Sequence, residues 1–282
     1  MKYKFVYDKD FLKNRFFELN YEEVEVVRAI ICGGHHALLY GDNPERLLDA
    51  IQFLTRETMP QQKPEPTVSV TQFFGGGKDL RKGCVSLADG GILFMENLHK
   101  FRDYIISLTT SPMDNGCIHL QRNSEYEVHP AHFQLVATTK CCECGGYKST
   151  KFHCSCSSDS IIRWWNKMKG ITSRCGIIYN CSEDISRTLV SVNVLKDYIS
   201  RDWNSHLNKM GSSIKNCEIP NYEDLVFTDE AETIFSGKVI PSPMYKPIEI
   251  ARVARTLADM RGHEMIRVSD VTTAVNWYQR LP

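Results

Sequence analysis

The sequence has no apolar run long enough to span a membrane, and it has no excess of charge of either sign. Lys and Arg number 34, as do Asp and Glu, so the formal net charge is zero. The global basic field typical of nonspecific nucleic-acid binding is therefore absent, although a local basic patch is compatible with this balance. The first ten residues are charged and aromatic, unlike a secretory signal peptide. We therefore expect a cytoplasmic protein that does not enter a membrane.

The eleven cysteines are unevenly distributed, since five of them lie between Cys141 and Cys156. A secreted disulfide scaffold spreads its cysteines through a much shorter chain. The clustering therefore favours a reducing compartment and a metal site. The 282 residues, 42% hydrophobic and 24% charged, suffice for one large or two modest globular domains.

Residues 90–98, Gly-Gly-Ile-Leu-Phe-Met-Glu-Asn-Leu, are the most informative stretch. Their apolar run predicts a strand buried on both faces. An apolar run that ends in an acid has the form of a Walker B strand, whose first acid helps to hold Mg²⁺ on a nucleotide. Here the strand ends in Glu96-Asn97 rather than Asp-Glu. An amide cannot accept a proton from an attacking water at neutral pH, so Asn97 cannot serve as a general base.

Apolar periodicity and capping residues predict an α/β half followed by a helical half. Asn20 and Glu23 form a capping-box pair at the start of a helix. Further strands are expected at 35–40, 67–74, 133–138 and 176–180, a second helix from Pro44, a surface connection at 59–66 and a hairpin at Asn115-Gly116. The C-terminal helices are expected at 190–207, 229–235, 247–261 and 269–281, the last capped by Ser269. We therefore divide the chain into a leader (1–19), an α/β core (20–182) with an inserted cysteine-rich loop (139–157), and a helical domain (183–282).

Several longer segments carry a family likeness: GILFMENLHKF at 91–101, SPMDNG at 111–116, FQLVATTKCCECGGY at 133–147 and ARVARTLADM at 251–260. Together they resemble the magnesium-chelatase-like AAA+ ATPases, in particular the ComM/YifB branch. The resemblance implies a P-loop AAA+ α-β-α core with a mainly parallel sheet, followed by an all-helical C-terminal lid. It also implies ATP and Mg²⁺ as ligands, and assembly as a homo-oligomer or as a hetero-oligomer with AAA+ relatives.

The expected phosphate loop, residues 41–48, departs from the pattern that binds a triphosphate. Gly41 and the change from strand to helix are retained, but the phosphate-binding Lys and the Mg²⁺-binding Ser or Thr are missing. Asp42 and Glu45 place carboxylates at a helix start that otherwise favours anions. Arg46 is the only local cation that offsets them. The alternative to a phosphate site is a tight acidic turn that binds nothing.

The resemblance also gives roles to other positions. Glu96 stands where the family has its Mg²⁺-associated Asp, and Lys140 stands where the family has a γ-phosphate-sensing Asn. Lys140 could instead supply the missing phosphate cation as a point charge. Arg174 matches the family's trans-acting arginine finger if a one-residue gap is allowed. The alternative is that Arg174 is a solvated arginine in a loop. The lid segment 242–245 lacks the family's Arg.

These departures lead us to interpret the chain as a degenerate AAA+ module that does not hydrolyse ATP and acts as an assembly or binding component. Two alternatives stay open. The first is an ATP-dependent remodelling motor of the ComM/YifB type that acts on DNA or protein. The second is a non-catalytic module that binds DNA through a patch of Arg163, Trp164, Trp165, Lys167 and Lys169, although the tryptophans suit a helix core better.

Cys142, Cys144, Cys154 and Cys156 form two CxC pairs separated by nine residues. Four thiolates are the ligand set of a closed structural Zn²⁺ site. Gly145-Gly146 allows the chain to turn back, and Cys141 and His153 are spare ligands. The alternative is a loop of reduced thiols or adventitious disulfides. We expect structural zinc in this loop.

Overall fold

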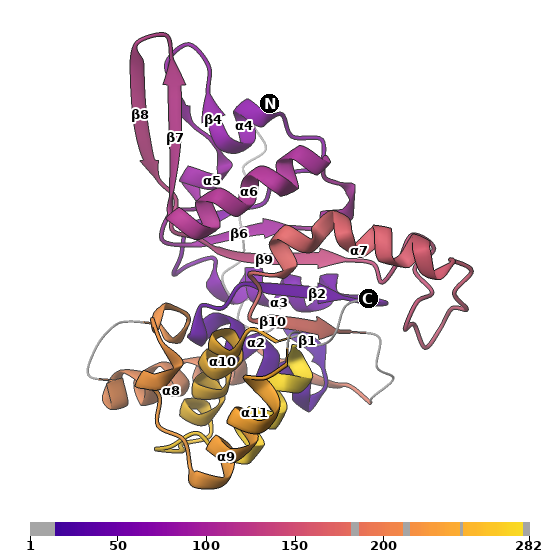
Figure 1. The fold of residues 1–282 in the computed structure, drawn as a ribbon, viewed down its shortest axis with the longest axis vertical. Helices are drawn as coiled ribbons and strands as arrows, with labels where there is room; N and C mark the ends of the chain where they lie inside the picture. The colour runs from indigo at the N-terminus through magenta and orange to yellow at the C-terminus, as the bar shows by residue number, and fades with distance from the viewer. Residues whose placement is uncertain (1–14, 182–185, 211–214, 243–244, 279–282) are drawn as a thin grey trace.

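A parallel five-stranded sheet forms the centre of the computed structural model, which describes residues 15–181, 186–210, 215–242 and 245–278. The strand order is β10-β2-β9-β6-β3, and every neighbouring pair is parallel (Figure 1). The bounds are β2 (Ala37–Tyr40), β3 (Gln61–Gln62), β6 (Ile92–Met95), β9 (Gln134–Thr139) and β10 (Ile177–Asn180). All residues of β2, β6, β9 and β10 are buried, as expected for parallel strands covered on both faces. The α/β fold with a mainly parallel sheet is therefore confirmed.

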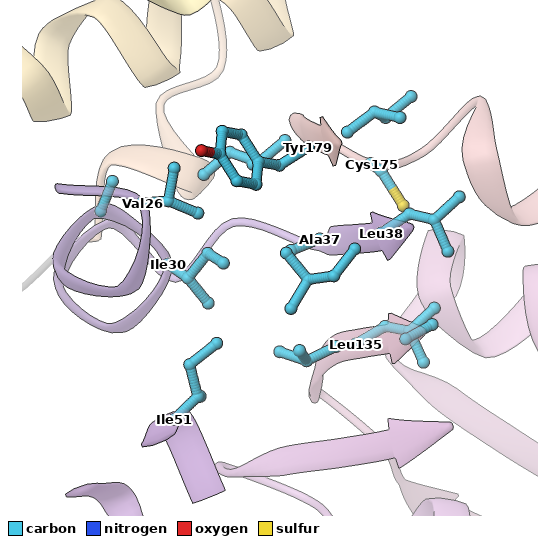
Figure 2. Close-up of a cluster of buried hydrophobic side chains, with 14 of the residues drawn as sticks. Val26, Ile30, Ala37, Leu38, Ile51, Leu135, Cys175 and Tyr179 are labelled. Atoms are coloured by element: carbon cyan, nitrogen blue, oxygen red, sulfur yellow. The ribbon is translucent and has the colours of Figure 1, made fainter. Parts of the chain in front are cut away.

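Helix α2 (Tyr21–Gly33) begins at the predicted capping box. The Asn20 side chain accepts the Glu23 N–H at 2.8 Å, and the Glu23 carboxylate accepts the Asn20 N–H at 2.9 Å. Val26 and Ile30 of this helix meet side chains of β2, β9 and α3 in the apolar core (Figure 2). The other helices of this half are α3 (Glu45–Thr55), α6 (Asp103–Asn115) and α7 (Ser158–Thr172), together with the 3₁₀ turn η1 (Leu98–Lys100).

The C-terminal helices gather beside β10 (Figure 1). They are α8 (Val192–Met210), α9 (Asp229–Ile234), α10 (Pro247–Met260) and α11 (Val268–Trp277), with short turns η2 (Asn216–Glu218) and η3 (Tyr222–Asp224) and the π-helical turn η4 (Phe235–Val239). Ion pairs fix them to α2, because Arg28 lies 2.7 Å from Asp202 and Arg261 lies 3.1 Å from Glu25. The expected cap at Ser269 is wrong, because Arg267 occupies the cap position of α11.

Small antiparallel pairs and short helices complete the fold. β1 (Phe16–Leu19) pairs with β11 (Thr188–Ser191), β4 (Gly75–Gly76) with β5 (Arg81–Lys82), and β7 (Cys117–Arg122) with β8 (Glu125–Pro130). The short helices are α4 (Val70–Phe74) and α5 (Cys84–Leu87). The β7–β8 hairpin projects at the end of the molecule opposite the C-terminal helices (Figure 1).

Two further local predictions are wrong, and one is incomplete. Part of the strand expected at 67–74 is helix α4, because Ser69 and Gln72 form a capping box at its start. Asn115-Gly116 is not a hairpin turn, because Gly116 adopts φ 64° and caps the end of α6. The connection expected at 59–66 contains the edge strand β3.

Part of the sequence-based interpretation lies outside the described residues, namely the first fourteen residues of the expected leader, the start of the expected helical domain at 183–185, and Met244 in the lid segment. Residues 16–19 of that leader form β1. Within the described ranges, no helix is long and apolar enough to cross a membrane. The division into three segments stays a prediction.

Gly91 lies where the backbone of residue 60 comes closest to the start of β6. The Ile92 N–H donates to the Pro60 carbonyl oxygen at 2.9 Å, and a Cβ on Gly91 would lie 1.9 Å from that oxygen. We expect Gly91→Ala to lower the free energy of unfolding by about 3 kcal/mol, because backbone must move to relieve the overlap. Urea denaturation of the purified variant measures this loss.

Gly90→Ala is the matched control. Gly90 has φ 71°, but a Cβ added there would meet nothing within 4 Å, so the change should cost only the left-handed strain of about 1–2 kcal/mol. Equal losses in the two variants would contradict the close-approach argument.

Candidate functional site

The carboxyl ends of the parallel strands bring most of the predicted nucleotide-site residues to one edge of the sheet. The 41–44 turn follows β2, Glu96-Asn97 follows β6, and Lys140 follows β9. β2 lies between β9 and β10, which both come later in the chain, and ligands of open α/β sheets bind at the carboxyl edge of such a switch in strand order. This edge is therefore the candidate site.

The turn after β2 leads directly into α3. Gly41 has φ 120°, a conformation that favours glycine, and Pro44 occupies the cap position without a side-chain cap bond. Asp42 and Glu45 are half-buried. The turn therefore keeps the strand-to-helix geometry of a phosphate loop while presenting acidic side chains.

Arg46, the predicted local cation, is bound to another part of the protein. Its Nη2 lies 2.6 Å from Glu23 Oε1 and its Nη1 donates to the Glu18 carbonyl oxygen at 2.8 Å. Glu23 is 1% exposed and also lies 3.3 Å from Arg187 Nε. The prediction that Arg46 offsets the acids of the turn is therefore wrong, because a buried carboxylate already neutralises its charge.

Glu96 and Asn97 stand at the end of β6 as predicted. Glu96 Oε2 lies 2.6 Å from Lys63 Nζ, which follows the edge strand β3. Asn97 adopts φ 56°, and its N–H donates to Thr138 Oγ1 at 2.9 Å. Sequence reasoning missed Lys63, because only the pairing of β3 with β6 brings it to this edge.

Lys140 is exposed at the end of β9, and aromatic rings lie beside it. The Trp164 Nε1–H donates to the Lys140 carbonyl oxygen at 3.2 Å, and the Trp164 ring lies 4.9 Å from the His99 ring between centroids. Burial and the nearby lysines lower the pKa of His99 to about 4. His99 is therefore neutral at physiological pH.

The patch considered for DNA binding is divided by the fold. Trp165 is buried and packs edge-on against Tyr40, with ring centroids 5.3 Å apart. Lys167 Nζ donates to the His99 carbonyl oxygen and pairs with Asp103 at 2.9 Å. The core position favoured for the tryptophans therefore holds for Trp165, whose ring cannot reach a base, and Lys167 of the alternative DNA patch is already paired.

Arg174 lies at the opposite edge, immediately before β10. Its Nε donates to Asp114 Oδ1 at 2.6 Å, its Nη2 pairs with the second carboxylate oxygen, and its Nη1 donates to the Gly170 carbonyl oxygen at 2.6 Å. This pairing lowers the pKa of Asp114. Both residues line a cavity of about 720 Å³ together with Lys215 and Lys246. Arg174 is therefore neither part of this chain's own carboxyl edge nor a freely solvated arginine.

The structure brings the four predicted thiols of the cysteine loop together. The sulfur atoms of Cys142, Cys144, Cys154 and Cys156 all lie within 4.8 Å of one another. The Sγ–Sγ distances are 3.4 Å for Cys142–Cys144 and 3.8 Å for Cys142–Cys154 and Cys144–Cys154. Backbone N–H donors from Gly146 and Ser155 lower the pKa of Cys144 to about 5.

Gly146 makes this arrangement possible. A Cβ on Gly146 would lie 2.6 Å from the His153 carbonyl oxygen, so only glycine lets the two halves of the loop approach this closely. The cluster that the structure forms does not include Cys141 or His153, the spare ligands. The loop therefore presents the tetrathiolate set predicted from sequence.

Comparison with known proteins agrees with this fold. The family described as "Magnesium chelatase, subunit ChlI" matches residues 50–185. The "Uncharacterized protein YifB" of Escherichia coli is 32% identical over 111 residues, which cover 39% of this chain and 22% of that protein. The "Competence protein ComM" of Haemophilus influenzae is 24% identical over 234 residues, covering 77% of this chain and 44% of that protein.

An uncharacterized protein of Mycobacterium tuberculosis is 30% identical over 150 residues, covering 53% of this chain and 27% of the relative. The chain thus spans less than half the length of each of these relatives. The matched region includes α6, β6, β9 and the cysteine loop. The family match, the relatives and the parallel α/β fold together support a magnesium-chelatase-like family for this chain.

Proposed function

We propose that this chain is an AAA+ module that does not hydrolyse ATP and acts as an assembly or binding component. The observation that carries the proposal is the state of the charges at the carboxyl edge. Arg46 is paired with Glu23, and Glu96 is paired with Lys63. Arg46 is therefore not available to bind a phosphate. Glu96, at the end of β6, is likewise not an unpaired carboxylate that could bind a metal.

The residues of this edge do not fit MgATP. The turn supplies Asp42 and Glu45 in place of a phosphate lysine, and like charges oppose the binding of a triphosphate. Asn97 supplies an amide where a base would activate water. Lys140 is exposed at the same edge, but one point charge is a weak substitute for a full phosphate loop. A module of this kind acts through its surfaces, as a homo-oligomer or as a subunit beside an AAA+ relative.

We also propose that the cysteine loop holds one structural zinc ion. A Zn–S distance of about 2.3 Å in a tetrahedron places sulfur atoms about 3.8 Å apart. The Sγ–Sγ distances of 3.4–3.8 Å among Cys142, Cys144 and Cys154 agree with this spacing, and all four sulfur atoms lie within 4.8 Å of one another. Residues 140–157 contain no helix or strand. A metal therefore supplies the cross-links that an apolar core would otherwise supply.

Calorimetric titration with MgATP tests the proposed lack of nucleotide chemistry. We expect no saturable heat in the wild-type protein and no phosphate release above background, because the edge offers no complete phosphate or metal site. Glu96→Ala should leave both readings unchanged.

Turnover by the wild-type protein that Glu96→Ala abolishes would overturn the proposal in favour of an ATP-driven motor. Glu57→Ala is the control, since Glu57 is an exposed acid at the end of α3 with 64% of its side chain accessible. Turnover that persists in both variants would indicate a contaminating ATPase.

A further inference from the structure

The ion pair between Lys63 and Glu96 occupies the place where a Walker B carboxylate meets its metal. Lys63 Nζ lies 2.6 Å from Glu96 Oε2, within the range of a charge-assisted hydrogen bond. The two side chains are 33% and 30% exposed. The pair is therefore sheltered, yet it borders open space into which an ion from solvent can enter.

The backbone around Lys63 is held firmly against β6. Pairing of Gln62 with Leu93 places the next residue, Lys63, at the carboxyl edge of the sheet. On the other side of Lys63, Pro64 is buried and restricts its predecessor to an extended conformation. The Pro60 carbonyl oxygen accepts the Ile92 N–H at 2.9 Å. The backbone that carries the Lys63 side chain is thus fixed beside β6.

A cavity of about 420 Å³ surrounds the pair, lined by residues 63–67, Glu96, Asn97 and Lys100. It contains two lysines, Lys63 and Lys100, and two carboxylates, Glu65 and Glu96, so the charges of its lining sum to zero. A divalent cation entering it meets no net negative charge. Removal of the Lys63 charge would leave a net charge of −1 with two carboxylates and an amide oxygen as ligands.

Mg²⁺ and Lys63 compete for Glu96 in this arrangement. Mg²⁺ requires oxygen ligands at about 2.0–2.1 Å in octahedral geometry, and an ammonium group has three donors and no acceptor. The observed contact uses one of the two carboxylate oxygens of Glu96 and sets a positive charge next to any cation that binds the other. The residues present therefore do not fit the metal that the family implies.

We propose that the Lys63 ammonium is a built-in replacement for the divalent cation at the end of β6. The chain neutralises Glu96 with its own positive charge, so this edge keeps its fold without binding a metal. This inference rests on the proposed absence of nucleotide chemistry and names the residue responsible for the missing metal. Lys63 acts on Glu96 and is a positioning residue, not a catalytic one.

Titration with MnCl₂ alone, followed by the electron paramagnetic resonance signal of free Mn²⁺, tests the replacement. Mn²⁺ is a hard cation that prefers carboxylates to thiolates, so the cysteine loop does not compete for it. We expect no saturable site in the wild-type protein at low millimolar concentration. Lys63→Met should gain one Mn²⁺ site whose affinity is at least about tenfold higher than any binding by the wild-type protein, because a unit positive charge in contact with Glu96 is removed.

Lys100→Met is the matched control, since it removes a lysine from the same cavity without freeing Glu96, and should give a much smaller gain. Adding Glu96→Gln to Lys63→Met should abolish the new site. Lys63→Gln repeats the test with a polar side chain if the methionine variant folds poorly, as judged by circular dichroism.

Saturable Mn²⁺ binding by the wild-type protein that Glu96→Gln removes would overturn the inference. So would the absence of any gain in folded Lys63→Met and Lys63→Gln protein. The titration contains no nucleotide, so its outcome is separate from that of the MgATP experiment. MgATP hydrolysis by the wild-type protein that Glu96→Ala abolishes would refute the proposed function, whatever Mn²⁺ alone does.

Discussion

Replacing Cys142 and Cys154 together with serine is expected to remove the zinc that copurifies with the wild-type protein. Four thiolates hold about one zinc per chain, and two hydroxyl groups cannot complete a tetrahedral sulfur site. Structural zinc sites contribute roughly 10–16 kcal/mol in zinc-finger peptides, so their loss unfolds the segment they cross-link. Elemental analysis of protein purified without chelator measures the zinc content. The rate of trypsin cleavage after the exposed Lys151 measures whether the loop has unfolded.

Cys84→Ser is the control, because Cys84 is a half-buried thiol in helix α5 that is not part of the cluster. It should keep the full zinc content and the trypsin resistance of the wild-type loop. A wild-type protein that contains no zinc while its loop resists trypsin would refute the metal site.

Glu23→Ala is expected to lower the free energy of unfolding by about 3–5 kcal/mol, because it leaves two arginines without their buried partner. Glu23 is 1% exposed and lies 2.6 Å from Arg46 and 3.3 Å from Arg187. It also accepts the Asn20 N–H that begins α2. Urea denaturation followed by circular dichroism measures the loss.

The matched control is again Glu57→Ala, whose carboxylate lies 3.8 Å from Arg56 and 3.5 Å from Lys196 while remaining 64% exposed. Exposed pairs contribute about 0–1 kcal/mol, so this variant should unfold at nearly the wild-type urea concentration. A loss in Glu23→Ala as small as in the control would mean that the arginines find other partners or water when the carboxylate is removed.

Strands buried on both faces could be predicted locally because their apolar runs are continuous. β2, β6, β9 and β10 all lie within or beside the expected ranges. The edge strand β3 could not be predicted in this way, since Gln61-Gln62 is polar and is a strand only through its pairing with β6. The capping box at Asn20 was equally local and is confirmed.

The misplaced hairpin has a similar cause. Asn115-Gly116 suits a hairpin turn and a helix end equally well, because both need a left-handed residue. In the structure, Gly116 caps the C-terminal end of helix α6. The hairpin that forms, β7–β8, turns instead near Asn123, which has φ 53°.

Residue types and their spacing were sufficient to predict the parallel α/β fold, the four clustered thiols and the departures from a phosphate loop, because these features depend on neighbours along the chain. Which charges neutralise one another was decided by tertiary contacts. Arg46 meets Glu23, and Lys63 meets Glu96, only after helices and strands pack. Coulomb energy depends on the distance between charges and on their burial, and neither quantity can be obtained from the order of the residues alone. The folded arrangement therefore decides whether Glu96 faces a metal or a lysine.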